Sequence, residues 1–283
     1  MASGFVTNQE VKMTQTVIDV QYVTKVFPNG TVALKGVSLS VPKGQMMALI
    51  GLSGSGKSTL MRHLNGLTQP TTGDIHVLGT HVNSANPREL RALRRQVGFI
   101  FQQFGLVGRL TAIENVLSGA LGSISGPRFG VASYKLELRK QAMEHLDRVG
   151  LGDYAFQRAD TLSGGQMQRV AIARSLMQKP SLMLADEPVA SLDPESSAQV
   201  MDIMLRIAKE EDLTVVVTLH QVELAMGWAD RIVGLRDGVV VLDDEPKKIG
   251  TKKVMEVYQR VTPEGMNAEE LAKESLFKMG KLS

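Results

Sequence analysis

The chain of 283 residues is 43% hydrophobic and 22% charged, which is ordinary for a folded globular protein and excludes a largely disordered chain. Its net charge of +3 is mild and dispersed, so the composition gives no reason to expect nucleic-acid binding. The sequence contains no cysteine, which excludes disulfides and thiolate metal sites.

No apolar run approaches the roughly 18 to 20 residues that a membrane-spanning helix needs. We therefore expect any membrane association to depend on partner proteins. Residues 1–16 form a polar start without the basic segment and apolar core of a secretory signal, so we expect a loose N-terminal tail.

Short strands are the first predicted elements. Alternating β-branched residues indicate strands at 17–23 and 37–41, with a turn at Pro28-Asn29-Gly30 between them. This pair predicts an antiparallel edge. A nearly continuous apolar run at 45–50 then predicts a buried strand that leads into a glycine-rich loop, and a helix is expected to continue from 59 to 66.

The glycine-rich loop fits the phosphate-loop pattern, which chance alone would produce in about one chain in a hundred. Its backbone N–H groups are predicted to cradle phosphates, with Lys57 reaching the β- and γ-phosphates and the Ser58 hydroxyl ligating Mg²⁺. The strand before it and the helix after it are the context that this mechanism needs. The predicted ATP-binding residues here are Gly51, Ser53, Gly54, Ser55, Gly56, Lys57, Ser58 and Thr59.

Between Gln102 and Leu162 the pattern becomes helical, without strong strand signals. Thr111 and Glu114 form a capping box that starts one helix. A second helix is expected over 134–149, stopped by Gly150 and Gly152. A cluster of arginines at 88–95 is interpreted as a solvated helix face rather than a phosphate or lipid contact. We interpret residues from about 103 to 162 as an inserted helical subdomain.

The segment Leu162-Ser163-Gly164-Gly165-Gln166 precedes a periodic run at 166–177 that predicts a helix. Two consecutive glycines allow backbone N–H groups to crowd an anion at a helix start. The sequence therefore predicts a second phosphate-binding element, separate from the loop that contains Lys57.

An apolar strand at 181–185 ends in Asp186 and Glu187. An isolated pair of this kind would be interpreted as solvated acids that stop a strand. With a phosphate loop upstream, Asp186 is predicted to hold Mg²⁺ and Glu187 to polarise the attacking water as a general base.

A helix at 195–209 and another apolar strand at 214–218 complete a pattern of buried parallel strands alternating with helices. The predicted fold class is α/β: a P-loop NTPase core of the RecA-like kind, with an antiparallel β edge subdomain and the inserted helical subdomain. This ATPase domain is predicted to span 17–244, and residues 245–283 to form a C-terminal helical extension.

Over residues 17–242 the order and spacing of these motifs resemble the nucleotide-binding subunits of ABC transporters. The resemblance implies that Ser163, Gly164 and Gly165 bind the γ-phosphate of ATP held by the opposite subunit, and that Gln166 also belongs to this ATP-binding element. It thus implies a homodimer in which ATP is an interface ligand. The catalytic residues that it implies are Lys57, Glu187 and His220, where His220 would contact the γ-phosphate.

Three further positions match by motif. Gln102 resembles the family's glutamine that touches Mg²⁺, so the metal residues are predicted to be Ser58, Gln102 and Asp186. Asp193 resembles the aspartate of the loop that crosses the dimer interface, and before Pro194 it also reads as a helix N-cap. Phe27 matches an aromatic that stacks on adenine, with a buried edge-strand ring as the alternative.

One cassette in the chain, with only 59 residues between Gln102 and Leu162, favours an importer subunit bound to separate membrane proteins. The segments 101–110, 114–117, 119–122, 185–196 and 215–222 resemble the ATPase subunit of phosphonate importers. Phosphite importers have very similar ATPases. One departure is Gly105, where that subfamily usually has asparagine, in a stretch expected to receive the membrane subunit.

The resemblance implies an ATPase at the cytoplasmic face of the inner membrane, with two integral membrane permease subunits and, indirectly, a substrate-binding protein as partners. Two alternatives stay open. The first is an importer of another small solute, such as methionine or a polar amino acid. The second is a non-transport ABC ATPase that remodels nucleic acid, although no nucleic-acid partner is expected.

Overall fold

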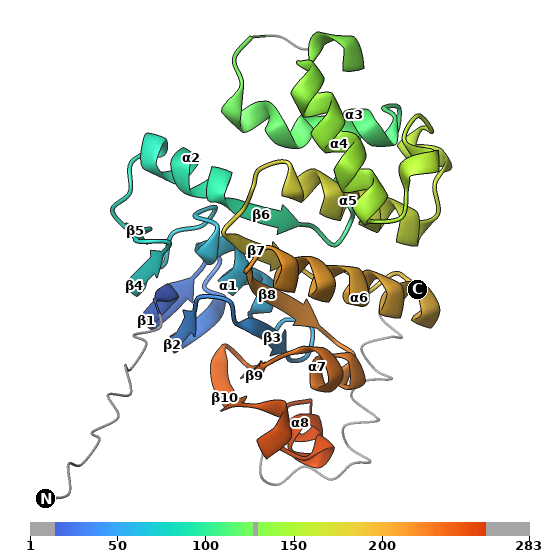
Figure 1. Cartoon of the computed structure of the whole chain (residues 1–283). Helices are drawn as coiled ribbons and strands as arrows, with labels where there is room; N and C mark the ends of the chain where they lie inside the picture. The colour runs from blue at the N-terminus through green and yellow to red at the C-terminus, as the bar shows by residue number, and fades with distance from the viewer. Residues whose placement is uncertain (1–14, 127–129, 259–283) are drawn as a thin grey trace, which may run out of the picture.

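We analysed a computed structural model of the chain, which describes residues 15–126 and 130–258 (Figure 1). Most of the predicted N-terminal tail therefore lies outside the described residues. So does the predicted C-terminal extension from residue 259 onward.

A six-stranded sheet in the order β10-β9-β3-β8-β7-β6 forms the middle of the molecule. All neighbours pair in parallel except β9 and β10, which are antiparallel. The carboxyl ends of β3, β7 and β8 consequently meet at one edge, where the glycine-rich loop, the acidic pair and His220 begin. The strands are β3 (Met46–Ile50), β6 (Val97–Ile100), β7 (Leu182–Ala185), β8 (Thr214–Leu219), β9 (Arg231–Arg236) and β10 (Val239–Asp244).

Successive residues of β3 point to opposite faces of this sheet and belong to two different cores. Met46, Ala48 and Ile50 pack in the core with the helices that follow β6 and β7. Met47 and Leu49 pack in the core formed with the antiparallel sheet and α1. Burial on both faces explains why β3 and β7 are continuously apolar in sequence, and why β8 is apolar apart from Thr214 and Thr218.

The antiparallel edge that the sequence predicts is confirmed as a four-stranded sheet in the order β2-β1-β4-β5. Its first two strands are longer than predicted, because register shifts in β1 interrupt the alternation on which the prediction depended. The strands are β1 (Thr16–Val26), β2 (Val32–Pro42), β4 (Thr72–Val77) and β5 (Thr80–His81).

Helices flank the sheets, and Figure 1 shows α3 and α4 set apart from the strands, with α5 running between them and the core. The helices at 59–66, 134–149, 166–177 and 195–209 are confirmed within a few residues of their predicted ends. The bounds are α1 (Lys57–Leu64), α2 (Pro87–Gln96), α3 (Ala112–Ser118), α4 (Leu136–Arg148), α5 (Gly164–Leu176), α6 (Pro194–Glu210), α7 (Val222–Trp228) and α8 (Thr251–Glu256).

Five short 3₁₀ helices complete the described elements: Gly119–Ser123, Val131–Ser133, Gly152–Tyr154, Ala159–Thr161 and Pro246–Lys248. The predicted subdomain bounds at about 103 and 162 stay a prediction, since α5 packs against both α3 and α4 and also against β6. In the part of the chain that the structure describes, no helix is both long and apolar enough to cross a membrane.

The start of α3 has the predicted capping box. Glu114 Oε2 accepts from the Thr111 backbone N–H at 2.8 Å, and Thr111 Oγ1 accepts from Glu114 N–H at 3.4 Å. One turn further along, Asn115 is 1% exposed and bonds back to the preceding loop. Its Oδ1 accepts from Val107 N–H at 2.8 Å, and its Nδ2 donates to the carbonyls of Val107, Leu110 and Thr111. This side chain therefore fixes the loop that follows Gln102.

We predict that Asn115→Ala lowers stability by about 2–3 kcal/mol, because it removes the side-chain hydrogen bonds that fix the loop and leaves the Val107 N–H without its partner. The melting temperature should fall by about 4–12 °C. Asn29→Ala is the matched control, since Asn29 is exposed and its side chain accepts a single bond, from Thr31 N–H. Equal melting temperatures for the two variants would contradict the assigned role of Asn115.

Candidate functional site

A cavity of about 290 Å³ lies at the edge where β3, β7 and β8 end. It brings together residues that the sequence predicted separately from motifs far apart in the chain. Its lining includes Ser53, Gly54, Gly56, Lys57, Ser58, Thr59, Gln102, Glu187 and His220, together with Ala33. All three predicted catalytic side chains therefore face one space.

The glycine-rich loop passes too close to its neighbours to carry side chains at two positions. A Cβ on Gly51 would lie 2.1 Å from the Leu235 carbonyl oxygen, and one on Gly56 would lie 2.5 Å from that of Ala33. Both glycines have positive φ, 148° and 105° respectively. Ser55 Oγ is buried in this loop and has no hydrogen-bond partner among the described residues, and Ser55 does not line the cavity.

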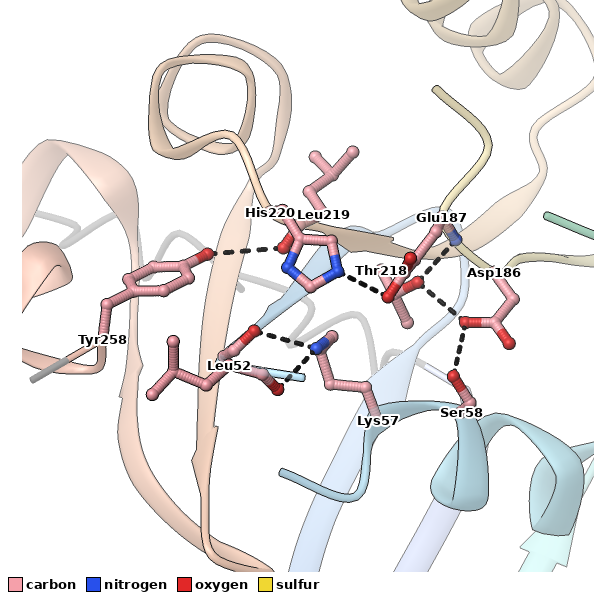
Figure 2. Close-up of polar contacts among 10 residues, drawn as sticks. Leu52, Lys57, Ser58, Asp186, Glu187, Thr218, Leu219, His220 and Tyr258 are labelled. Carbon is pink, nitrogen blue, oxygen red and sulfur yellow. Dashed lines mark hydrogen bonds and ion pairs between the residues drawn. The ribbon is translucent and has the colours of Figure 1, made fainter. Parts of the chain in front are cut away.

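Lys57 opens α1 and folds back over the loop. Its Nζ donates to the carbonyls of Gly51 at 2.8 Å and Leu52 at 3.0 Å (Figure 2). Burial lowers the pKa of Lys57, and the negative charges of Glu187 and Asp186 act in the opposite direction. The ammonium group is thus held at the cavity by carbonyl oxygens that a stronger anionic ligand can replace.

Asp186 receives two hydroxyl groups on one carboxylate oxygen. Ser58 Oγ donates to Asp186 Oδ1 at 3.1 Å, and Thr218 Oγ1 donates to the same atom at 2.9 Å. The hydroxyl of α1 and the carboxylate after β7 therefore lie side by side, although 128 residues separate them in sequence.

Glu187 has a φ of 50°, in the left-handed region that non-glycine residues rarely adopt. Its backbone N–H donates to Thr218 Oγ1 at 2.7 Å, which holds this conformation in place. The carboxylate then meets His220, with Glu187 Oε1 and His220 Nε2 2.5 Å apart (Figure 2).

Thr218 is a site residue that the sequence reasoning missed. Its hydroxyl accepts from Glu187 N–H and donates to Asp186, so one side chain positions both acidic residues. The signal available in the sequence was a threonine at the carboxyl end of a largely apolar strand, two residues before His220.

The second phosphate-binding element, residues 162–166, which we call the signature, lies elsewhere. Ser163 is the N-cap of α5, and it forms a capping box in which Ser163 N–H donates to Gln166 Oε1 at 2.8 Å. None of Ser163, Gly164, Gly165 and Gln166 lines the cavity that contains Lys57. Asp193 is confirmed as the N-cap of α6, where it accepts from Ser196 N–H at 2.9 Å, and it does not line the cavity either.

Phe27 lies half-buried just after β1, with Lys25 Nζ 5.3 Å from the centroid of its ring. It does not line the cavity. The ring is therefore not the fully buried one of the alternative interpretation, and adenine stacking stays a prediction.

The loop after Gln102 is fastened to α5. Arg174 donates to the carbonyls of Phe104, at 3.0 Å, and Gly105. Gly105 has a φ of 62°, a conformation that asparagine also tolerates better than most residues. Glycine in place of the subfamily's usual asparagine is therefore compatible with the same loop path.

We predict that Gly56→Ala weakens ATP binding by at least about tenfold, because the new Cβ would strain a loop that has no room for it. Gly227→Ala is the control, since a Cβ there would meet nothing within 4 Å. Fluorescence titration with a labelled ATP analogue measures both. Wild-type affinity in Gly56→Ala would contradict the assigned loop geometry.

Comparison with known proteins adds to this geometry. A family model described as ABC transporter matches residues 34–190. The phosphate-import ATP-binding protein PhnC of Mycolicibacterium smegmatis is 60% identical over 241 residues, covering 85% of this chain and 91% of that protein. The phosphonates import ATP-binding protein PhnC of Nocardia farcinica is 54% identical over 246 residues, covering 87% of this chain and 91% of that protein.

Solved structures share the fold. A dimeric ATP-binding cassette in a post-hydrolysis state, bound to ADP and Pi, has 36% identity and a TM-score of 0.72, covering 81% of this chain and 98% of that one. A cassette from Clostridium perfringens, part of the ABC transporter complex CbiONQ, has 28% identity and a TM-score of 0.75, covering 86% and 94%. The predicted α/β fold class is confirmed, and the chain belongs to the ABC transporter family.

Proposed function

We propose that this protein is the ATP-hydrolysing subunit of an ABC importer, and that the importer takes up phosphonate or a related phosphorus oxyanion. The observation that carries the ATPase assignment is the convergence of Lys57, Glu187 and His220 on one cavity. The substrate assignment is supported by relatives whose names specify import of phosphate or phosphonates.

The residues around Asp186 fit a magnesium ion. A serine hydroxyl and a carboxylate lie in contact, and an amide oxygen is available from Gln102 at the same cavity. Oxygen ligands of this kind are those that Mg²⁺ takes in proteins. Ser58, Asp186 and Gln102 would hold the ion, which supplies charge neutralisation at the β- and γ-phosphate oxygens.

Backbone and side-chain groups of the chain itself would bind the phosphates, accept the proton and orient the base. Backbone N–H groups of the glycine-rich loop bind the phosphates, and Lys57 exchanges its carbonyl partners for the β- and γ-phosphates. Glu187 accepts a proton from the attacking water, while Thr218 holds its backbone in place. His220 contacts the γ-phosphate and, through its contact with Glu187, orients the base.

A homodimer would complete each ATP site. Ser163, Gly164, Gly165, Gln166 and Asp193 lie outside the cavity of their own subunit, which suits residues that serve a partner's nucleotide. Dimeric cassettes among the structural neighbours support this arrangement. ATP then joins two subunits, and loss of the γ-phosphate would release them, which converts hydrolysis into movement.

The remaining partners would be two integral membrane permease subunits at the cytoplasmic face of the inner membrane, with a substrate-binding protein acting through them. Phe101 and Val107, beside Gln102, are 45% and 56% exposed, and such apolar exposure supports a protein contact. We place the permease contact on this surface.

We predict that Glu187→Gln lowers the ATP hydrolysis rate by at least about 100-fold, because the general base is lost while the binding residues are kept. The variant should elute as a dimer on gel filtration with ATP and as a monomer without it. Glu144→Gln, an exposed change on α4, is the control and should behave as the wild type. Only monomers of Glu187→Gln in the presence of ATP would contradict the proposed dimer.

The substrate class has its own test. The complex should be purified with its membrane subunits and binding protein and placed in lipid vesicles. We expect phosphonate or phosphate to raise its ATPase rate, and methionine or polar amino acids to leave it unchanged. Stimulation by an amino acid would refute the phosphorus assignment, and salt-dependent DNA or RNA binding without membrane partners would refute transport altogether.

A further inference from the structure

The chain after β10 returns to the catalytic edge of the sheet. The 3₁₀ helix Pro246–Lys248 and α8 lead to Tyr258, the last described residue. Figure 2 shows the Tyr258 hydroxyl pointing at the end of β8 from one side, while Glu187 meets the His220 ring from the other. The predicted extension thus reaches Leu219, the residue immediately before the one that the proposed function makes the γ-phosphate contact.

The approach of this segment is fixed by packing. Val254 and Val257 are buried in the same core as Leu219 and Val222, which flank His220 and Gln221. Gly234 of β9 makes room for Val257, since a Cβ there would lie 2.7 Å from Val257 Cγ2. In the sheet, Gly234 pairs with Ile50, the residue that immediately precedes the glycine-rich loop.

Tyr258 itself lies half-buried against this core. Its hydroxyl donates to the Leu219 carbonyl over a long contact of 3.4 Å. Burial raises the pKa of Tyr258, and hydrogen bonding with the Gly51 backbone acts in the opposite direction. The hydroxyl therefore lies against the carbonyl of the residue before His220.

The segment also supports the other side of His220. α8 packs against α7, which begins at Val222, two residues after His220. Arg236 of β9 donates to the Glu256 carbonyl at 3.4 Å, which ties the end of α8 to the sheet. The backbone on both sides of His220 is thus in contact with residues from 251 to 258.

We infer that Tyr258 is a positioning residue for His220, through which the segment after β10 sets the geometry of the His220–Glu187 pair. The inference rests on the proposed role of His220 in ATP hydrolysis. Tyr258 touches neither the reacting atoms nor the cavity lining, so its effect passes through the Leu219 carbonyl and the backbone that follows. The Tyr258–Leu219 hydrogen bond is made by the segment after β10, and not by the phosphate loop or the signature.

The test uses Tyr258→Phe in the full chain, which keeps the ring and removes only the hydroxyl. We expect kcat for ATP hydrolysis to fall about two- to tenfold, the effect of one hydrogen bond, with KM for ATP within about twofold of wild type. Tyr258→Ala, which also removes the ring, should lower kcat further. Tyr22→Phe is the control, because Tyr22 is 78% exposed on the antiparallel sheet.

Histidine side-chain NMR gives a readout that does not depend on catalysis. The chain has five histidines, so their signals can be assigned by substitution. In Tyr258→Phe the His220 signals should shift, and those of His76 and His81 should not. Unchanged His220 signals would overturn the inference. If the melting temperature of Tyr258→Phe also fell while the His220 signals stayed unchanged, Tyr258 would be assigned to packing alone.

The two proposals fail in different ways. A wild-type chain that hydrolyses no ATP would contradict the proposed function, while the NMR comparison would still decide whether Tyr258 positions His220. Normal wild-type hydrolysis with an identical kcat in Tyr258→Phe would contradict the positioning role and leave the ATPase assignment standing.

Discussion

Parallel pairing of β3, β8 and β7 is the constraint on which the site depends. It aligns the ends of three strands, so that the phosphate loop, His220 and the acidic pair start from one edge. Thr218 then connects two of these ends, because its hydroxyl bonds to both Asp186 and the backbone of Glu187. A shift of one residue in either pairing would separate the carboxylates from the loop that they face.

The loop after Gln102 joins the nucleotide site to the surface that partners would contact. Arg174 of α5 holds the loop after Gln102, and α5 begins at the signature residues. Asn115 fixes the next part of that loop from α3. A partner that moves this loop would therefore act on α5, the helix that starts at the second phosphate-binding element, which would give a physical route between the proposed membrane subunits and that element.

The sequence predicted the structure best where a role depends on residues that are neighbours in the chain. The phosphate loop, the Thr111–Glu114 capping box and the Asp193 N-cap are local patterns, and each has the predicted local structure. Thr218 and Tyr258 were missed because their roles arise only when distant segments meet. Strand β5 gave no clear signal because it has two residues at the edge of its sheet, and β4 gave none because Ile75 and Val77 are its only apolar residues besides a glycine. The roles of Phe27 and of the signature residues depend on a nucleotide and a second subunit, which a single chain does not contain.

The central claim is that each ATP is held by Lys57 of one subunit and Ser163 of the other. Complementation between two inactive variants, Lys57→Ala and Ser163→Arg, tests it directly. Mixed in equal amounts, they should recover about a quarter of the wild-type ATPase rate, because half of the dimers are mixed and each mixed dimer has one complete site. No recovery in mixed dimers would contradict the account, because it would mean that Ser163 serves the nucleotide of its own subunit.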